Sequence, residues 1–126
     1  MATISPSATI ESFVAGADLS AVGTKYKLVK ASTAADGAMV RCAVLGEAAL
    51  GVLQDSPASG RAGAVAIHGK CKVQLGATIA RGVLFSADAT GRATTALTTH
   101  FVLGVILQSG VVGEWVDALY MPMGKL

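Results

Sequence analysis

Two segments of this chain of 126 residues are nearly the same, and this repetition limits the folds open to it. "LGVLQDSPASGRAGAVAI" occupies residues 50–67, and "LGVILQSGVVGEWVDALY" occupies residues 103–120. A looser match precedes them, since "ADLSAVGTKYKLV" from Ala17 corresponds to "ATIARGVLFSA" from Ala77. The copies lie 60 residues apart at this first match and 53 apart at the last, so an insertion or deletion separates them. The sequence therefore predicts a tandem duplication of a unit of roughly 55 residues. The alternative is that two strand-turn-strand motifs look alike because strands use few residue types.

Short segments rich in Val, Ile, Leu, Thr and aromatic residues recur between glycines, as in all-β proteins. Ten of them qualify as strands: "TIESFVA", "KYKLVKA", "AMVRCAVL", "ALGVLQ", "GAVAIHG", "CKVQLG", "VLFSA", "RATTAL", "HFVLGVILQ" and "EWVDALYM". No stretch of eleven or more residues keeps a helical apolar spacing without interruption. Gly37 and Gly91 stand where tight hairpins need positive φ. We therefore predict an all-β fold, a compact antiparallel β-barrel or β-sandwich of about ten short strands built from two tandem repeats.

The expected organisation is one domain with an extended N-terminal arm. Residues 1–12 form the flexible arm and residues 13–126 the β domain, with repeat one at about 17–70 and repeat two at about 77–121. Since each unit is too short to bury much surface alone, the two copies are expected to share a core with a pseudo-two-fold relation.

Within the repeated segments, Val52 and its counterpart Val105 are expected to face the core. The glycines beside them, Gly51 and Gly104, are expected to permit a bulge or a close approach of two backbones.

The composition favours a protein that works inside an assembly. Only 14% of the residues are charged, against about 25% in typical domains, so part of the surface is expected to be buried against partners. The formal net charge of +2 is spread along the chain, and the one basic cluster is formed by Lys25, Lys27 and Lys30. Nucleic acid is therefore not expected as a partner.

Residues that could perform chemistry are few and lack catalytic spacing. The two histidines, His68 and His100, form no metal-binding motif with each other or with the cysteines. Cys42 and Cys71 are expected to be small buried hydrophobic residues rather than a disulfide or a nucleophile. We therefore expect no enzyme activity, no cofactor, no metal site and no small-molecule substrate.

The first residues, "MATISPSATIESF", lack the basic and apolar regions of a secretory signal, which predicts synthesis in the cytoplasm. The longest uncharged run, residues 93–113, contains four threonines, His100 and three glycines. It is therefore not expected to span a membrane.

Two places are candidate contacts with a partner in an assembly or with another subunit. The arm carries an uncharged stretch that could add a strand to a partner's sheet, formed by Thr3, Ile4, Ser5 and Pro6. In the second repeat, Glu114 stands where the first has Arg61, Trp115 and Asp117 replace small residues of the first, and Trp115 is the only tryptophan. The alternative for Trp115 is a core or rim position within its own domain.

Four segments together resemble a known family: "VAGADLSAVGTKYKLV", "ALGVLQDSPASGRAGAVAIHGKCKVQLG", "ARGVLFSADATGRAT" and "LGVILQSGVVGEWVDALYM". The chain from about Phe13 to Met121 is similar to the small capsid cement, or head decoration, proteins of tailed bacteriophages. Many members carry a more acidic turn where this chain has Ser59, Gly60 and Arg61.

The resemblance implies a structural virion protein made in the host cytoplasm and located on the capsid exterior. It implies binding to the assembled head as a homotrimer that bridges subunits of the major capsid protein and stabilises the shell. Two other functions remain open: another virion or adhesion module, such as a tail or baseplate component or a glycan-binding domain, and a small enzyme that uses a cysteine or histidine.

Overall fold

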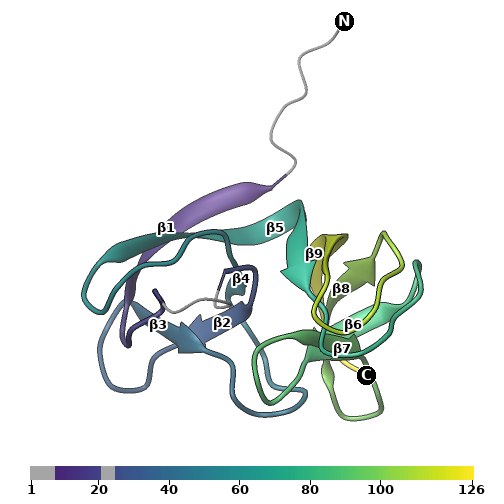
Figure 1. Ribbon diagram of the computed structural model, residues 1–126. Coiled ribbons are helices and arrows are strands. Elements are labelled where there is room, and N and C mark those ends of the chain that lie inside the picture. Colours follow the sequence, from purple (N-terminus) through teal and green to yellow (C-terminus); the bar gives the residue numbers. More distant parts are fainter. Residues whose placement is uncertain (1–7, 21–24) are drawn as a thin grey trace, which may run out of the picture.

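The computed structural model describes residues 8–20 and 25–126, and all regular structure in these ranges is β-strand. The nine strands are β1 (Thr9–Ala15), β2 (Leu28–Ala31), β3 (Ala38–Arg41), β4 (Gly51–Leu53), β5 (Ala62–Gln74), β6 (Leu84–Ala87), β7 (Ala93–Thr95), β8 (Phe101–Ile106) and β9 (Trp115–Lys125) (Figure 1). The predicted all-β fold is confirmed. None of the described residues belongs to a helix with the length and apolarity needed to cross a membrane.

Two boundaries differ from the sequence expectation. The segments 63–69 and 71–76, expected as two strands, are joined in the single strand β5, because Gly69 adopts φ 103° inside the strand instead of ending it. At the N-terminus, β1 begins at Thr9, so residues 9–12 of the expected arm pair with β5. Residues 1–7 of that arm lie outside the described residues.

The strands form two rings that share β5 (Figure 1). The first lobe consists of β1 to β4 and residues 62–68 of β5, in the order β1-β3-β2-β4-β5, and pairing of β5 with β1 closes the ring. The second lobe consists of the remainder of β5 with β9, β8, β6 and β7, and a bridge between Leu75 and Ala93 closes it. Most pairs are antiparallel, whereas β1 and β3 are parallel.

The duplication is visible in the backbone hydrogen bonds, because bonds of the first lobe recur between corresponding residues of the second. Ala15 N donates to Arg61 O at 2.8 Å in the first lobe, and Leu75 N donates to Glu114 O at 2.9 Å in the second. Donor and acceptor are displaced by the 60 and 53 residues that separate the sequence repeats. The bond from Leu19 N to Pro57 O matches that from Ile79 N to Gly110 O at the same two displacements. The bond from Tyr26 N to Leu53 O matches that from Gly82 N to Ile106 O, with the donors 56 and the acceptors 53 residues apart.

Glycines act at the predicted turns and close approaches. Gly37 and Gly91 have φ of 69° and 80° and lie in the β2–β3 and β6–β7 connections, whose strands pair antiparallel. A Cβ atom at Gly51 would collide with the carbonyl oxygen of Ala66, and one at Gly104 would collide with that of Leu119. The predicted close approach is therefore confirmed in both repeats.

The first lobe encloses a small core of its own: Ala15, Leu19, Val29, Met39, Leu53 and Val65. The larger core fills the second lobe and continues to the outer surface of the first, where it includes Leu28, Val52 and Ala66. These three are neighbours across β2, β4 and β5.

The two lobes are not related by a two-fold axis, which corrects the expected packing. The counterparts of the buried trio are Leu84, Val105 and Leu119, which are neighbours across β6, β8 and β9. All three are only half-buried. A two-fold arrangement would bury the same face of both lobes, so the lobes pack head to tail. The prediction that Val105 faces the core is wrong for this reason.

Candidate functional site

The turn between β8 and β9 exposes three large apolar side chains within five residues. Val111 is 54%, Val112 55% and Trp115 50% exposed, and we call these residues the Trp115 tip. The Glu114 carboxylate accepts a hydrogen bond from Val111 N at 2.7 Å, which holds the turn. Clustered exposed apolar residues of this size are typical of contact surfaces.

The first lobe lacks such a tip. At the corresponding positions it has Ala58, Ser59 and Ala62, although the backbone bond from Arg61 N to Ala58 O is matched by that from Glu114 N to Val111 O. The shared turn geometry therefore does not require large side chains, which points to a role outside the lobe itself.

Tyr26 supports the tip from the other lobe. Its ring packs edge-on against Trp115, with centroids 5.0 Å apart and planes at 72°. Tyr26 has φ 66°, and its counterpart in the second lobe is Gly82 with φ 84°. A side chain in this conformation costs about 1 kcal/mol relative to glycine. A strained Tyr where the other copy has Gly is typical of a functional position.

The other predicted contact residues have different surroundings. Asp117 lies in β9 on the same outward face as Trp115, where it forms an ion pair with Lys72 at 3.1 Å and its amide donates to Gln108 Oε1. Glu114 belongs to the turn, as described above. Thr3, Ile4, Ser5 and Pro6 lie outside the described residues. Glu114 and Trp115 thus share one turn, and Asp117 borders it.

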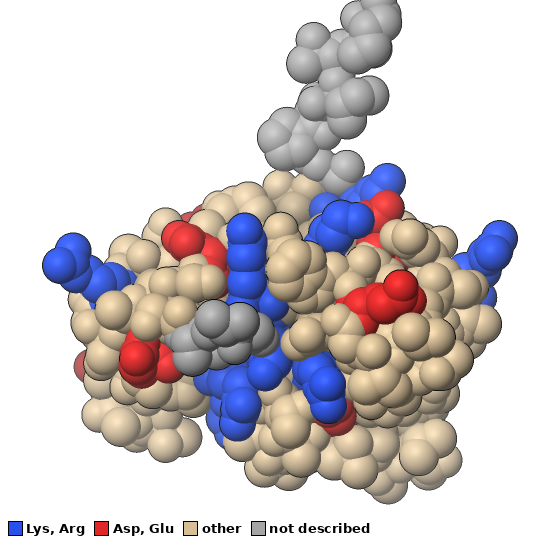
Figure 2. All heavy atoms as spheres, in the orientation of Figure 1, with Lys and Arg blue, Asp and Glu red and all other residues tan. Residues whose placement is uncertain are grey.

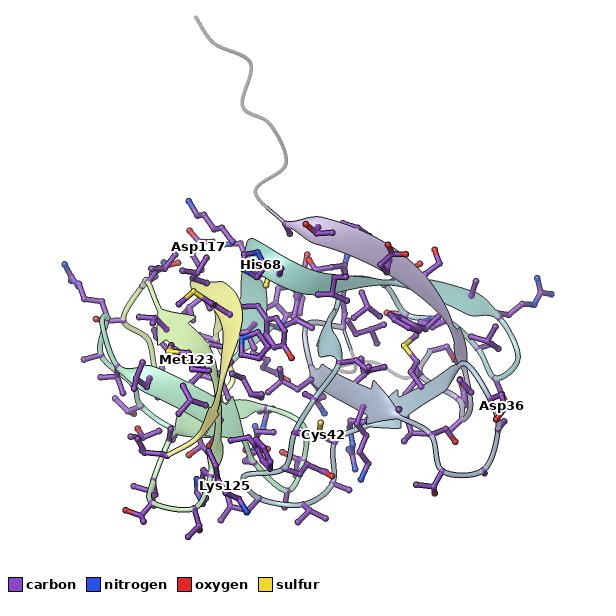
Figure 3. All side chains as sticks on the ribbon, turned by 180° about the vertical axis from the view of Figure 1, so that it is seen from behind. Asp36, Cys42, His68, Asp117, Met123 and Lys125 are labelled. Atoms are coloured by element: carbon purple, nitrogen blue, oxygen red, sulfur yellow. The ribbon has the colours of Figure 1, made fainter. Side chains whose placement is uncertain are left out.

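A second apolar patch lies at the opposite end of β9, which runs from near Asp117 to Lys125 (Figure 3). Four side chains, each more than half exposed, form what we call the basal patch: Val44, Leu45, Leu97 and Leu126. Backbone bonds connect these loops, since Phe101 N donates to Gly46 O at 2.9 Å and Leu126 N to His100 O at 2.8 Å. Sequence analysis missed this patch because its members come from three distant segments with no common motif.

Several side chains that could take part in chemistry are buried and contribute to packing. Ser86 Oγ lies 3.2 Å from His100 Nδ1, which also accepts a hydrogen bond from Leu97 N, and both side chains are buried. Cys42 and Cys71 are unpaired and buried, as predicted, and burial raises the pKa of each thiol to about 12. Among the described residues there is no cluster of three His, Cys, Asp or Glu side chains suited to a metal ion.

Comparisons with known proteins give a match in structure only. No family model matches the sequence, and no curated protein sequence matches it. The fold is similar to the crystal structure of the head fiber gp8.5 N base in bacteriophage phi29, with a TM-score of 0.70 and 17% sequence identity. The similarity covers 94% of this chain and 97% of that one. Over nearly its whole length, this chain therefore has the fold of a phage head fiber base.

Proposed function

We propose that this protein is a structural protein of a phage virion that binds the outer surface of the assembled head, bridges major capsid subunits and stabilises the shell. The observation that carries the proposal is the fold shared with a head fiber base over 94% of the chain. The sequence resemblance to head decoration proteins points to the same location by a separate route.

A bridging protein needs two separate contact surfaces, and the described surface has two apolar patches at opposite ends of β9. We assign the Trp115 tip to the capsid and the basal patch to contacts between copies in a homotrimer. The tip offers an aromatic anchor, which dominates binding energy in many interfaces. A protein that binds only the assembled lattice stabilises that lattice by mass action, and many copies multiply modest contacts.

Sedimentation with undecorated, expanded heads tests the head-binding role. We expect saturable binding of the purified protein, and we expect the double variant Val112→Ser, Trp115→Ala to bind at least about tenfold more weakly because the anchor is lost. Ile10→Ser, at a similarly exposed apolar residue on β1, is the matched control. The proposal fails if the protein stays in the supernatant at high concentration and low salt. Tip variants that bind like the wild type refute the assignment of the tip.

The mass in solution tests the role of the basal patch. We expect the purified protein to have the mass of three chains of 12.6 kDa each. We expect the double variant Leu45→Ser, Leu97→Ser to have the mass of a monomer. A wild-type monomer at high concentration contradicts the trimer.

One observation favours a glycan-binding module as the second candidate, namely the contact between the half-buried Tyr26 ring and the exposed Trp115 ring. Aromatic rings with an exposed face can pack against sugars. Strong hits on a glycan array that disappear in Trp115→Ala would favour this alternative over head binding.

A further inference from the structure

The seam between the two lobes brings together three basic residues that are far apart in sequence. Leu28 N donates to Gly91 O at 2.7 Å, and Leu28 O accepts a hydrogen bond from Cys42 N at 2.9 Å. Lys27, Arg41 and Arg92 are the chain neighbours of these three bonded residues, and we call them the seam cluster. Figure 2 shows basic side chains gathered over the middle of the molecule, where the lobes meet.

The packing of Arg41 shows how closely the cluster is held. A Cβ atom placed on Gly91 would lie 2.7 Å from Arg41 Cγ, so the arginine stem lies against the β6–β7 turn. The glycine therefore gives room for a guanidinium from the first lobe beside Arg92 of the second.

The positive charge of the seam cluster is poorly compensated. The carboxylate of Glu47 is paired with Lys30 at 2.8 Å, and that of Asp117 with Lys72 at 3.1 Å. Asp88 lies 3.9 Å from Arg92 Nε. All eight acidic residues of the chain are described, and in the described ranges neither Lys27 nor Arg41 has an ion pair.

The charged form of Lys27 is destabilised by its surroundings. Burial lowers the pKa of its ammonium group, Arg41 and Arg92 lower it further, and Asp88 opposes them. Folding thus brings the positive charges of Lys27, Arg41 and Arg92 together at half-buried positions. Such an arrangement is unfavourable without a negative charge nearby.

The seam cluster continues into the Trp115 tip. Lys25 Nζ lies 5.2 Å from the centre of the Tyr26 ring, and Tyr26 contacts Trp115. Lys25 and Lys27, the chain neighbours of Tyr26, thus bring basic charge next to the aromatic anchor. Apolar anchors surrounded by charged groups are typical of protein interfaces, where the charges give specificity.

We propose that the seam cluster binds the carboxylates of an acidic protein segment, which on the proposed function belongs to the shell beneath the Trp115 tip. Guanidinium groups bind carboxylates through two parallel hydrogen bonds, and a second cation strengthens such a site. A nucleic acid would require a longer basic stripe along its phosphates. The seam cluster is compact, and Lys30 and Lys72 are engaged in ion pairs.

Titration with hexaglutamate at low salt, followed by NMR, tests the site without heads. We expect saturable shifts at residues around the seam, and at least tenfold weaker binding by the double variant Lys27→Gln, Arg41→Gln. The control Arg61→Gln, Lys70→Gln removes the same charge from exposed residues elsewhere and is expected to bind like the wild type. Equal weakening by both pairs, or the absence of saturable binding, overturns the proposal. So does tighter binding of a thymidine hexanucleotide, which would indicate a nucleic-acid surface.

Thermal unfolding separates a binding role from a structural one. Lys27→Gln relieves repulsion, so we expect its melting temperature to stay equal to that of the wild type or to rise; a clear fall would make Lys27 a structural residue and overturn the assignment. With expanded heads, the seam variants should bind more weakly and with less dependence on salt. If the wild type binds hexaglutamate but no heads, the head-binding role fails while the seam site stands.

Discussion

Gly51 and Gly104 lie where two backbones come closest, at equivalent places in the two lobes. In each case the obstacle to a side chain is a carbonyl oxygen of the neighbouring strand, which cannot move without breaking the sheet. We expect Gly51→Ala and Gly104→Ala each to lower the free energy of unfolding by at least about 3 kcal/mol, measured in urea.

Gly37→Ala is the control for these two variants. Gly37 has nothing within 4 Å of its Cβ position, so only its φ of 69° opposes a side chain. The expected cost is about 1 kcal/mol. Equal losses in all three variants would contradict the close approach as the reason that Gly51 and Gly104 are necessary.

Residues with positive φ follow the duplication. Thr99 has φ 74° and its counterpart in the first lobe is Gly46 with φ 77°, as Tyr26 corresponds to Gly82. The sequence could identify the hairpin glycines because a tight turn has a local signature. It could not identify Tyr26 or Thr99, because only the aligned hydrogen bonds show that these positions need a left-handed backbone.

The loop between β3 and β4 is held by one carboxylate. Glu47 accepts hydrogen bonds from Lys30 Nζ and from the amides of Ala43 and Val44, at 2.8, 2.7 and 2.8 Å. Burial alone would raise the pKa of Glu47, but these bonds outweigh it, and the pKa lies below its ordinary value. The ionised group therefore stabilises the folded protein above the ordinary value of 4.5, and this contribution is lost as the pH falls through the lower folded-state pKa.

We expect Glu47→Gln to reduce the free energy of unfolding at pH 7 by about 1 kcal/mol. Between pH 7 and pH 3 the variant should lose less stability than the wild type, since it has no carboxylate to protonate at this position. Chemical denaturation at a series of pH values measures both effects. Glu11→Gln, at an exposed residue of β1, is the control. A variant with the same pH profile as the wild type would contradict the role of this loop contact.

The extended conformation of β5 could be predicted from the sequence, but its continuity through Gly69 could not. The apolar alternation on either side of Gly69 correctly predicted two extended segments, and a glycine in such a place is typical of a turn. The strand continues because residues 62–68 pair with β1 and β4 while residues 69–74 pair with β9. Those partners lie far away in the chain, so local pattern could not predict the continuity.

At the scale of the whole molecule, the shared strand and the continuous core predict cooperative unfolding. The larger core contains Leu28 and Val52 of the first lobe together with the interior of the second, and Tyr120 Oη donates to Ala49 O across the seam at 2.9 Å. We expect a single transition in urea, with coincident curves from Trp115 fluorescence and far-ultraviolet circular dichroism.

Two core variants, one in each lobe, test this cooperative unfolding further. Val65→Ala in the core of the first lobe and Val116→Ala in that of the second should each lower the stability of the whole molecule by on the order of 2 kcal/mol. A loss of circular dichroism in Val65→Ala that precedes the change in fluorescence would show that the lobes unfold separately.

The candidate site was predictable in part. Trp115 could be singled out because the two repeats differ at that turn. The seam cluster could not, because Arg92 of the second lobe joins Lys27 and Arg41 of the first only when the lobes pack together. The same packing explains the pseudo-two-fold error, since repeated sequences do not specify which of their faces will be buried.

The passage of β5 through both lobes also has a mechanical consequence. A force that reaches the second lobe at Trp115 acts on a strand hydrogen-bonded to residues 69–74 of β5, and the covalent backbone carries it on to residues 62–68 in the first lobe. Since β5 is one continuous strand from Ala62 to Gln74, it contains no flexible linker that could extend under tension. If the protein bridges capsid subunits as proposed, we expect it to resist the outward pressure of a packed genome with little extension.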